Sequence, residues 1–163
     1  MNIREIFSEA DVARLAKTAR KVWREANTSF CSAEQVEYMI KRYQSFEAIT
    51  GQLMLGYRYF IFEQDGDILA YFGVQQQGER LFLSKFYVVK EYRGLGLFSV
   101  GLDVMREICR EGGMSAIYLT VNRNNHHACE VYRHKGFEVI AEEDNDIGYG
   151  FEMNDYIMQL EVE

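Results

Sequence analysis

Hydrophobic and polar positions alternate with two different periods along the chain, and they predict an ordered series of strands and helices. Residues 3–6 suit a short first strand. Over residues 12–23 the apolar side chains recur at three- and four-residue steps, which indicates an amphipathic helix. A second helix is predicted to begin at Ser32, an N-cap residue with a glutamine three positions later, and to continue to Gly51.

The middle of the chain has the pattern of a β-meander. Residues 57–63 and 68–74 are aromatic and β-branched runs, and the Asp65–Gly66 pair between them is a strong hairpin signal. A second turn at 77–79 leads into a third strand over 81–89. We therefore expect three antiparallel strands in sequence.

The last part of the chain alternates between helix and strand. An apolar face of Phe98, Leu102, Met105 and Cys109 predicts a helix that ends at Gly112. It is followed by a strand over 117–121, a helix over 125–135, a strand from 137, an acidic loop and a last strand over 156–162. The strands 81–89 and 117–121 should be parallel, joined by a right-handed crossover.

These elements favour an α/β fold of the mixed-sheet (α+β) kind, with about seven strands and about four helices on its faces. The length of 163 residues suits a single domain spanning 1–163. A net charge of −7 disfavours a nucleic-acid partner. Three cysteines without metal-type spacing predict neither a disulfide framework nor a metal site. The charged N-terminal stretch lacks the apolar run of a signal peptide or membrane span, so we expect a cytoplasmic location.

The junction between the strand at 81–89 and the following helix is suited to a phosphate ligand. Gly94 and Gly96 let the backbone approach an anion closely, and the helix start supplies unpaired N–H groups. No Lys-Ser/Thr pair closes a P-loop, and Ser99 stands where a dinucleotide fingerprint has its third glycine. A different phosphorylated ligand is therefore indicated.

A second segment strengthens this interpretation. Asn125, Ala128 and Tyr132 follow one another at helical spacing, and Gly136–Phe137 ends the helix. The spacing predicts that Asn125 and Tyr132 share one helix face, about 10 Å apart along the axis.

Together the two segments, within residues 81–140, resemble the GNAT superfamily of acetyl-CoA-dependent N-acetyltransferases. The phosphate-turn signature Arg/Gln-x-x-Gly-x-Gly/Ala corresponds to Arg93, Gly96 and Phe98, and the second signature corresponds to the segment from Asn125 to Phe137. Two positions depart from the pattern. Phe98 replaces a small residue, so its side chain must turn away from the pyrophosphate, and Lys90 stands where proline is frequent.

The resemblance implies a GNAT-like acyl-CoA N-acyltransferase fold and acetyl-CoA as co-substrate, lying between the parallel strands. It implies that backbone N–H groups hold the pyrophosphate and that the thioester lies beside residues 86–88. Tyr132 matches the general acid that protonates the leaving thiolate. The implied cofactor-binding residues are Phe86, Tyr87, Val88, Arg93, Gly94, Leu95, Gly96, Leu97, Phe98, Ser99, Asn125, Tyr132 and Lys135.

The acceptor and the general base are not identified by the sequence. Candidate bases are Glu37, Asp146, Tyr149, Glu152 and Asp155. The resemblance implies an acceptor pocket built by the first two helices and the strands near the C-terminus. In this chain these segments would form an acidic, tyrosine-rich rim, which favours a small amine, a polyamine or a peptide amine as substrate. The rim comprises Trp23, Tyr38, Tyr43, Glu142, Glu143, Asp144, Asp146, Tyr149 and Glu152. Two alternatives stay open, a non-catalytic acyl-CoA sensor module and a nucleotide-binding regulatory domain. A homodimer is expected from general frequency.

Overall fold

The computed structural model describes residues 1–28 and 31–163, which form seven strands and five α-helices in a mixed α/β fold. The strands, in sheet order β1-β2-β3-β4-β5-β7-β6, confirm the expected sheet. They are β1 (Asn2–Glu5), β2 (Arg58–Gln64), β3 (Asp67–Gln77), β4 (Arg80–Val88), β5 (Ala116–Asn122), β6 (Glu138–Gly148) and β7 (Phe151–Glu161). The helices are α1 (Glu9–Asn27), α2 (Ala33–Met39), α3 (Phe46–Met54), α4 (Leu97–Gly112) and α5 (His126–His134).

The chain forms two compact units, and β3, β4 and α4 contribute residues to both. The first unit contains Met1–Gln75 and Lys85–Val100, and the second contains Gln76–Ser84 and Gly101–Glu163. No helix in the described part of the chain combines the length and apolar character needed to cross a membrane.

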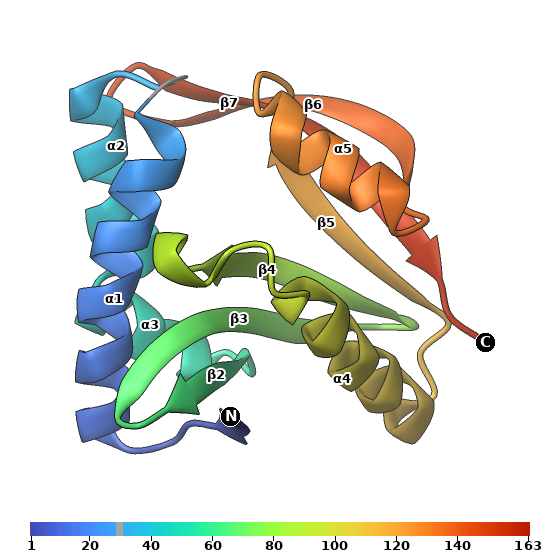
Figure 1. Ribbon diagram of the computed structural model, residues 1–163. Coiled ribbons are helices and arrows are strands. Elements are labelled where there is room, and N and C mark those ends of the chain that lie inside the picture. The colour runs from blue at the N-terminus through green and yellow to red at the C-terminus, as the bar shows by residue number, and fades with distance from the viewer. Residues whose placement is uncertain (29–30) are drawn as a thin grey trace. The chain divides into compact units, whose positions relative to one another are not determined.

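In the first unit, helices α1 and α3 cover one face of the β2–β3 hairpin (Figure 1). The hairpin is antiparallel and turns at Asp65–Gly66, as predicted. Alternation along β2 directs Tyr59 and Ile61 into the helix-covered core, while Phe60 stacks on Phe72 on the opposite face. Both faces of the hairpin are therefore buried, which explains its nearly continuous apolar sequence.

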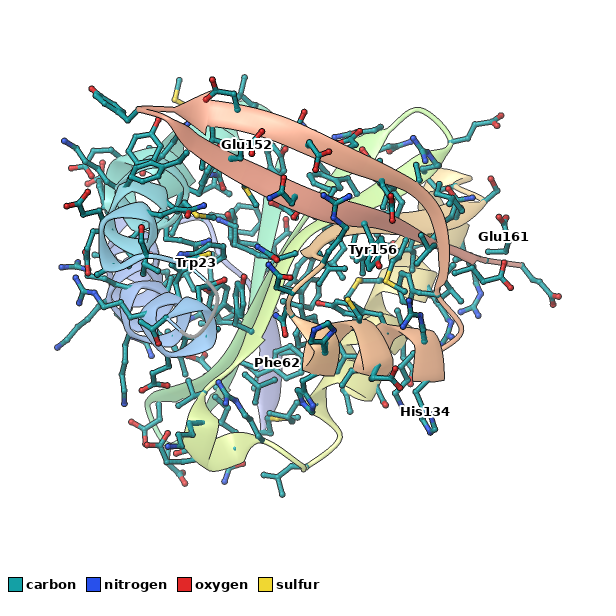
Figure 2. The ribbon with its side chains drawn as sticks, turned by 90° about the horizontal axis from the view of Figure 1, so that it is seen from above. Trp23, Phe62, His134, Glu152, Tyr156 and Glu161 are labelled. Atoms are coloured by element: carbon teal, nitrogen blue, oxygen red, sulfur yellow. The ribbon has the colours of Figure 1, made fainter. Side chains whose placement is uncertain are left out.

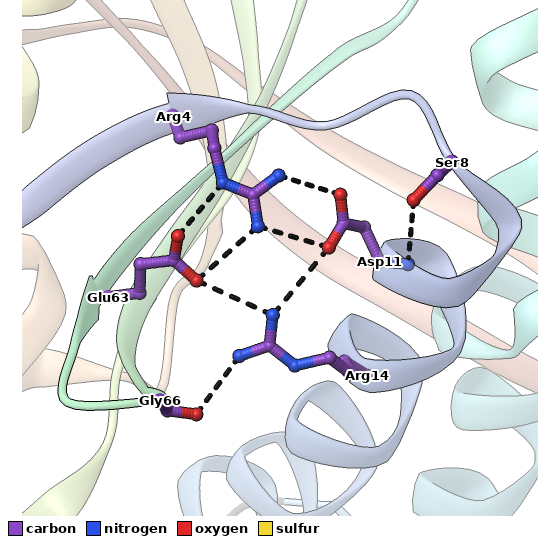
Figure 3. A network of polar contacts seen from close by, with 6 residues as sticks. All are labelled: Arg4, Ser8, Asp11, Arg14, Glu63 and Gly66. Atoms are coloured by element: carbon purple, nitrogen blue, oxygen red, sulfur yellow. Dashed lines mark hydrogen bonds and ion pairs between the residues drawn. The ribbon is translucent and has the colours of Figure 1, made fainter.

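A network of charged side chains joins β1, α1 and the hairpin (Figure 3). Arg4 donates to Asp11 at 2.7 Å and to Glu63 at 2.9 Å, and Arg14 donates to the Gly66 carbonyl at 3.0 Å. These bonds attach the first strand and helix to the β2–β3 turn.

The single helix predicted from Ser32 to Gly51 is wrong, because the segment divides into three pieces. Ser32 caps α2 as expected, but a π-helical stretch, η1 (Ile40–Gln44), follows and ends at Ser45. The extended backbone of Ser45 leaves the helix, and its hydroxyl oxygen accepts from Ala48 N at 3.1 Å to begin α3. Gly51 lies inside α3 and does not end a helix. The N-cap preference of serine outweighs the continuous apolar pattern here.

In the second unit, the start of β4 pairs with β5 in parallel, as predicted, with Arg80–Leu83 opposite Ala116–Leu119. Strand β7 then pairs antiparallel with both β5 and β6, and α5 lies alongside these strands (Figure 1).

The expected acidic loop is wrong, because Glu142, Glu143, Asp144 and Asp146 belong to β6. These residues pair with β7 along the hairpin and are exposed. Strand β6 ends the sheet order, and charged side chains are tolerated on an edge strand because they stay in water and discourage further pairing.

Candidate functional site

The turn Arg93–Ser99 in the first unit has the backbone form expected for an anion cradle. Gly94 and Gly96 have φ angles of 80° and 76°, a region that side chains with a Cβ rarely adopt. A Cβ added to either glycine would meet no atom within 4 Å, so the space beside both glycines is open. Helix α4 begins at Leu97 with no acidic residue in its first turn, so its positive end favours a phosphate. The residues present fit a pyrophosphate.

The side chains of Leu97 and Arg93 fix this turn to the rest of the first unit. Leu97 is buried, and the Arg93 Nε donates to the Val88 carbonyl at 3.3 Å. The sequence pattern predicts Phe98 on the apolar face of α4, but its side chain is only half-buried. Its ring packs edge-on against Phe86 with centroids 4.9 Å apart. The bulky residue at this position thus extends the aromatic layer of the first unit.

The β4 segment Phe86–Val88 is fixed by rings on both of its faces. Phe86 stacks on Phe72 at 5.3 Å, whereas Tyr87 contacts Trp23 at 5.4 Å on the opposite side. The Val89 N–H donates to the Leu69 carbonyl at 2.9 Å and holds the end of the strand. This rigid backbone is suited to orient a bound acyl group.

Tyr132, Asn125 and Lys135 lie in the second unit, on α5 or at its ends. Tyr132 is half-buried and its ring contacts Phe137 at 5.8 Å. The pKa of Tyr132 is raised to about 12, mainly by desolvation on burial and to a lesser extent by the nearby Cys129. The phenol is therefore protonated at neutral pH and able to donate.

Asn125 begins α5 as its N-cap rather than lying on its helical face. Its Oδ1 accepts from Ala128 N at 3.2 Å, and its backbone lies outside the helical region. Lys135 is the C-cap at the other end. The helix predicted to start at Asn125 thus begins one residue later, at His126, with Asn125 as its N-cap.

The five candidate bases differ sharply in their surroundings. Glu37 is hydrogen-bonded to Arg24 at 2.7 Å, which lowers the pKa of Glu37. Asp146 is exposed and accepts from Gly148 N, and both Glu152 and Tyr149 are exposed. Asp155 alone among these five is buried, with 4% of its surface exposed.

Sequence reasoning missed Lys85, a cation buried in the first unit with 6% of its surface exposed. Its Nζ donates to the Tyr43 carbonyl of η1 at 2.6 Å and lies 5.4 Å from the Tyr59 ring centroid. Desolvation lowers the pKa of Lys85 to about 7. The available signal was a lysine inside the apolar run 81–89.

The other aromatic rim residues lie on the first unit's helical segments. Tyr38 on α2 accepts from Arg42 at 2.9 Å, and Tyr43 belongs to η1. Trp23 on α1 (Figure 2) is buried, and its indole N–H has no hydrogen-bond partner among the residues that the structure describes.

The chain matches a protein-family model and solved structures. Residues 19–137 match the model of the family described as "Acetyltransferase (GNAT) family". The PaiA N-acetyltransferase of Thermoplasma acidophilum, solved with coenzyme A, has a TM-score of 0.79 and 23% identity, with 99% of each chain covered. No curated protein matches.

Two further solved structures share the fold. The ribosomal-protein-S18-alanine N-acetyltransferase of Escherichia coli has a TM-score of 0.71 and 19% identity, covering 99% of this chain and 93% of that one. YncA of Salmonella typhimurium, described as a putative acetyltransferase and solved with acetyl-CoA, has a TM-score of 0.65 and 17% identity, covering 100% and 95%. The expected fold is confirmed, and the expectation of acetyl-CoA as co-substrate agrees with the match to an acetyltransferase family.

Proposed function

The chain belongs to the GNAT acetyltransferase family, and on that premise we propose that it transfers the acetyl group of acetyl-CoA to a primary amine, with Tyr132 as general acid. The observation that carries this proposal is the open glycine turn at the start of α4, which fits the pyrophosphate of the co-substrate.

The first unit would hold the co-substrate at two places. Backbone N–H groups of Arg93–Ser99 bind the pyrophosphate oxygens. An N–H of the Phe86–Val88 segment donates to the thioester carbonyl and stabilises the negative charge that develops on its oxygen. Acetyl-CoA supplies an acyl carbon with a thiolate leaving group, and the aromatic packing around Phe86 keeps the donating backbone N–H in place.

The protein must then manage two protons. A new C–N bond forms to the acetyl carbon as the C–S bond breaks, so the amine loses a proton and the thiolate needs one. Tyr132 donates its phenolic proton to the thiolate, and its pKa of about 12 keeps it in the donating form at neutral pH. Such an acid typically contributes about 10²- to 10⁴-fold to the rate.

The substitution Tyr132→Phe tests this role by removing only the hydroxyl. Turnover, followed as release of free CoA thiol, should fall by about 10²- to 10⁴-fold. Acetyl-CoA should still raise the melting temperature as in the wild type, because ligand binding stabilises the folded state. Tyr156→Phe is a matched control, since Tyr156 is another half-buried tyrosine of the second unit (Figure 2).

Three results would contradict the assignment. Full turnover by Tyr132→Phe would remove the tyrosine from the mechanism. A wild type that binds acetyl-CoA but acetylates no amine would instead favour the sensor module, and stabilisation by ATP or NAD would favour a nucleotide-binding domain.

For the acceptor, we favour a small amine, a polyamine or a peptide terminus. Exposed carboxylates of the β6–β7 hairpin would attract a cation, although Arg123 pairs with Asp144 and lies 3.6 Å from Glu142. The Escherichia coli structural neighbour is named for acetylation of an alanine of a ribosomal protein. Spermidine, lysine peptides, an aminoglycoside and an alanine-terminated peptide form the test panel, and failure of all four to accelerate CoA release would refute the proposal.

The cytoplasmic location and the homodimer stay predictions from the sequence. Light scattering on the purified protein measures the oligomeric state directly.

A further inference from the structure

Asp155 occupies an unusual position in the second unit. It lies on β7 (Figure 2 labels its neighbour Tyr156), where it pairs with Asn122 of β5 on one side and Glu143 of β6 on the other. Only 4% of the residue is exposed. Its Oδ1 atom is buried and has no hydrogen-bond partner in residues 1–28 and 31–163.

A buried carboxylate oxygen without a partner is unfavourable, because the charge loses water and receives nothing in exchange. Arg123 is a cation that acts on Asp155, but its guanidinium binds Asp144 and lies 3.6 Å from Glu142. The other charged group that faces Asp155 is Glu143, which repels it. No described residue therefore donates a hydrogen bond to Oδ1 of the Asp155 carboxylate.

A ligand that satisfies this oxygen must bring a hydrogen-bond donor and benefits from a positive charge. A protonated amine offers both. We propose that Asp155 binds the ammonium group of the acceptor through Oδ1 and removes its proton as the general base. This inference rests on the proposed acetyl transfer and assigns the group that activates the amine.

The proton balance is complete with this assignment. Asp155 takes one N–H proton, and the nitrogen lone pair forms the C–N bond as the C–S bond breaks. The thiolate receives the proton of Tyr132, the resulting tyrosinate takes the second N–H proton of the former ammonium group through water, and the proton held by Asp155 returns to water. Each other candidate base is either exposed or already hydrogen-bonded, as Glu37 is to Arg24.

The ionisation of Asp155 agrees with this role. Desolvation first, and Glu143 second, raise its pKa to about 6, while Arg123 opposes them. Asp155 is therefore ionised at pH 7.5, yet it is a stronger base than an exposed aspartate. The expected pH profile of kcat/KM has an acidic limb near pH 6.

The test compares Asp155→Asn with the wild type and with Asp103→Asn, an exposed aspartate of α4 that controls for the same chemical change. With an amine that the wild type acetylates, Asp155→Asn should lower kcat/KM by about 10²- to 10³-fold. The acidic limb should disappear, and acetyl-CoA should still raise the melting temperature. Asp155→Glu should recover part of the rate, because it restores a carboxylate.

Several outcomes overturn the assignment. If Asp155→Asn keeps kcat/KM within twofold of the wild type, or keeps the acidic limb, Asp155 has a structural role only. If Asp155→Asn does not fold, the wild-type profile decides, and a profile without a limb near pH 6 refutes the base. A wild type that acetylates no amine refutes both this inference and the proposed function, whereas normal turnover with an unaffected Asp155→Asn refutes this inference alone.

Discussion

The close approach of Gly73 to Tyr59 makes Gly73→Ala a sharp test of the packing in the first unit. The two residues are partners in the β2–β3 register, and a Cβ added at Gly73 would lie 2.8 Å from Cε1 of Tyr59. Tyr59 cannot move aside easily, since it is fully buried and its hydroxyl donates to Gln52. The glycine therefore creates the space that the tyrosine ring fills.

The magnitude follows from this contact. Forcing an extra methyl group into a well-packed core costs about 1–3 kcal/mol. For a chain of 163 residues, each kcal/mol lowers the melting temperature by about 3 °C. Gly73→Ala should therefore lower it by about 3–9 °C, measured by circular dichroism on heating and checked by urea unfolding.

Two comparisons show whether the ring is responsible. Adding Tyr59→Leu removes the ring atoms, so Gly73→Ala should cost little further stability in that background. Gly51→Ala adds the same methyl group in α3, where nothing lies within 4 Å, and should stabilise by up to about 1 kcal/mol because alanine favours helix. If Gly73→Ala is as stable as the wild type, the close-contact argument fails.

Three further predictions concern charged groups. Because the pKa of Lys85 is lowered to about 7, the unfolded state holds a proton that the folded state lacks between about pH 7 and 10. The free energy of unfolding of the wild type, measured in urea, should therefore rise over this range relative to that of Lys85→Met, by at most about 5 kcal/mol. If the two free energies change in parallel with pH, the burial argument fails. The raised pKa of Asp155 makes stability change with pH in the opposite direction. Its contribution to the free energy of unfolding is present below about pH 4 and is lost as the pH rises through 6. The wild type should therefore lose about 3 kcal/mol relative to Asp155→Asn over that interval. Removing the partly exposed Arg4 of the network in Figure 3, as Arg4→Met, should cost about 1 kcal/mol, and a loss that does not shrink in 1 M NaCl would show that packing rather than charge is responsible.

Local signals in the sequence predicted most of the elements near the candidate site. The Asp65–Gly66 turn, the Ser32 cap and the glycine turn before α4 each depend on a few consecutive residues, so their conformations were predictable without knowledge of the fold. The two errors were also local in origin. Ser45 is a second helix cap inside the segment predicted as one helix, and the acidic run predicted as a loop belongs to β6, an edge strand that tolerates charged side chains.

The conformation of the glycine turn before α4 could be predicted from the sequence, because glycine positions and a helix start depend on adjacent residues. Only the tertiary structure determines the burial and the pKa values of Asp155 and Lys85. In the sequence each is an ordinary charged residue in or beside a strand, and the same residue in water has its usual pKa. Burial is set by distant segments: η1 brings the Tyr43 carbonyl to Lys85, and β5 and β6 enclose Asp155. Loss of solvent is a property of the assembled core, so only the fold shows which charged groups have unusual chemistry.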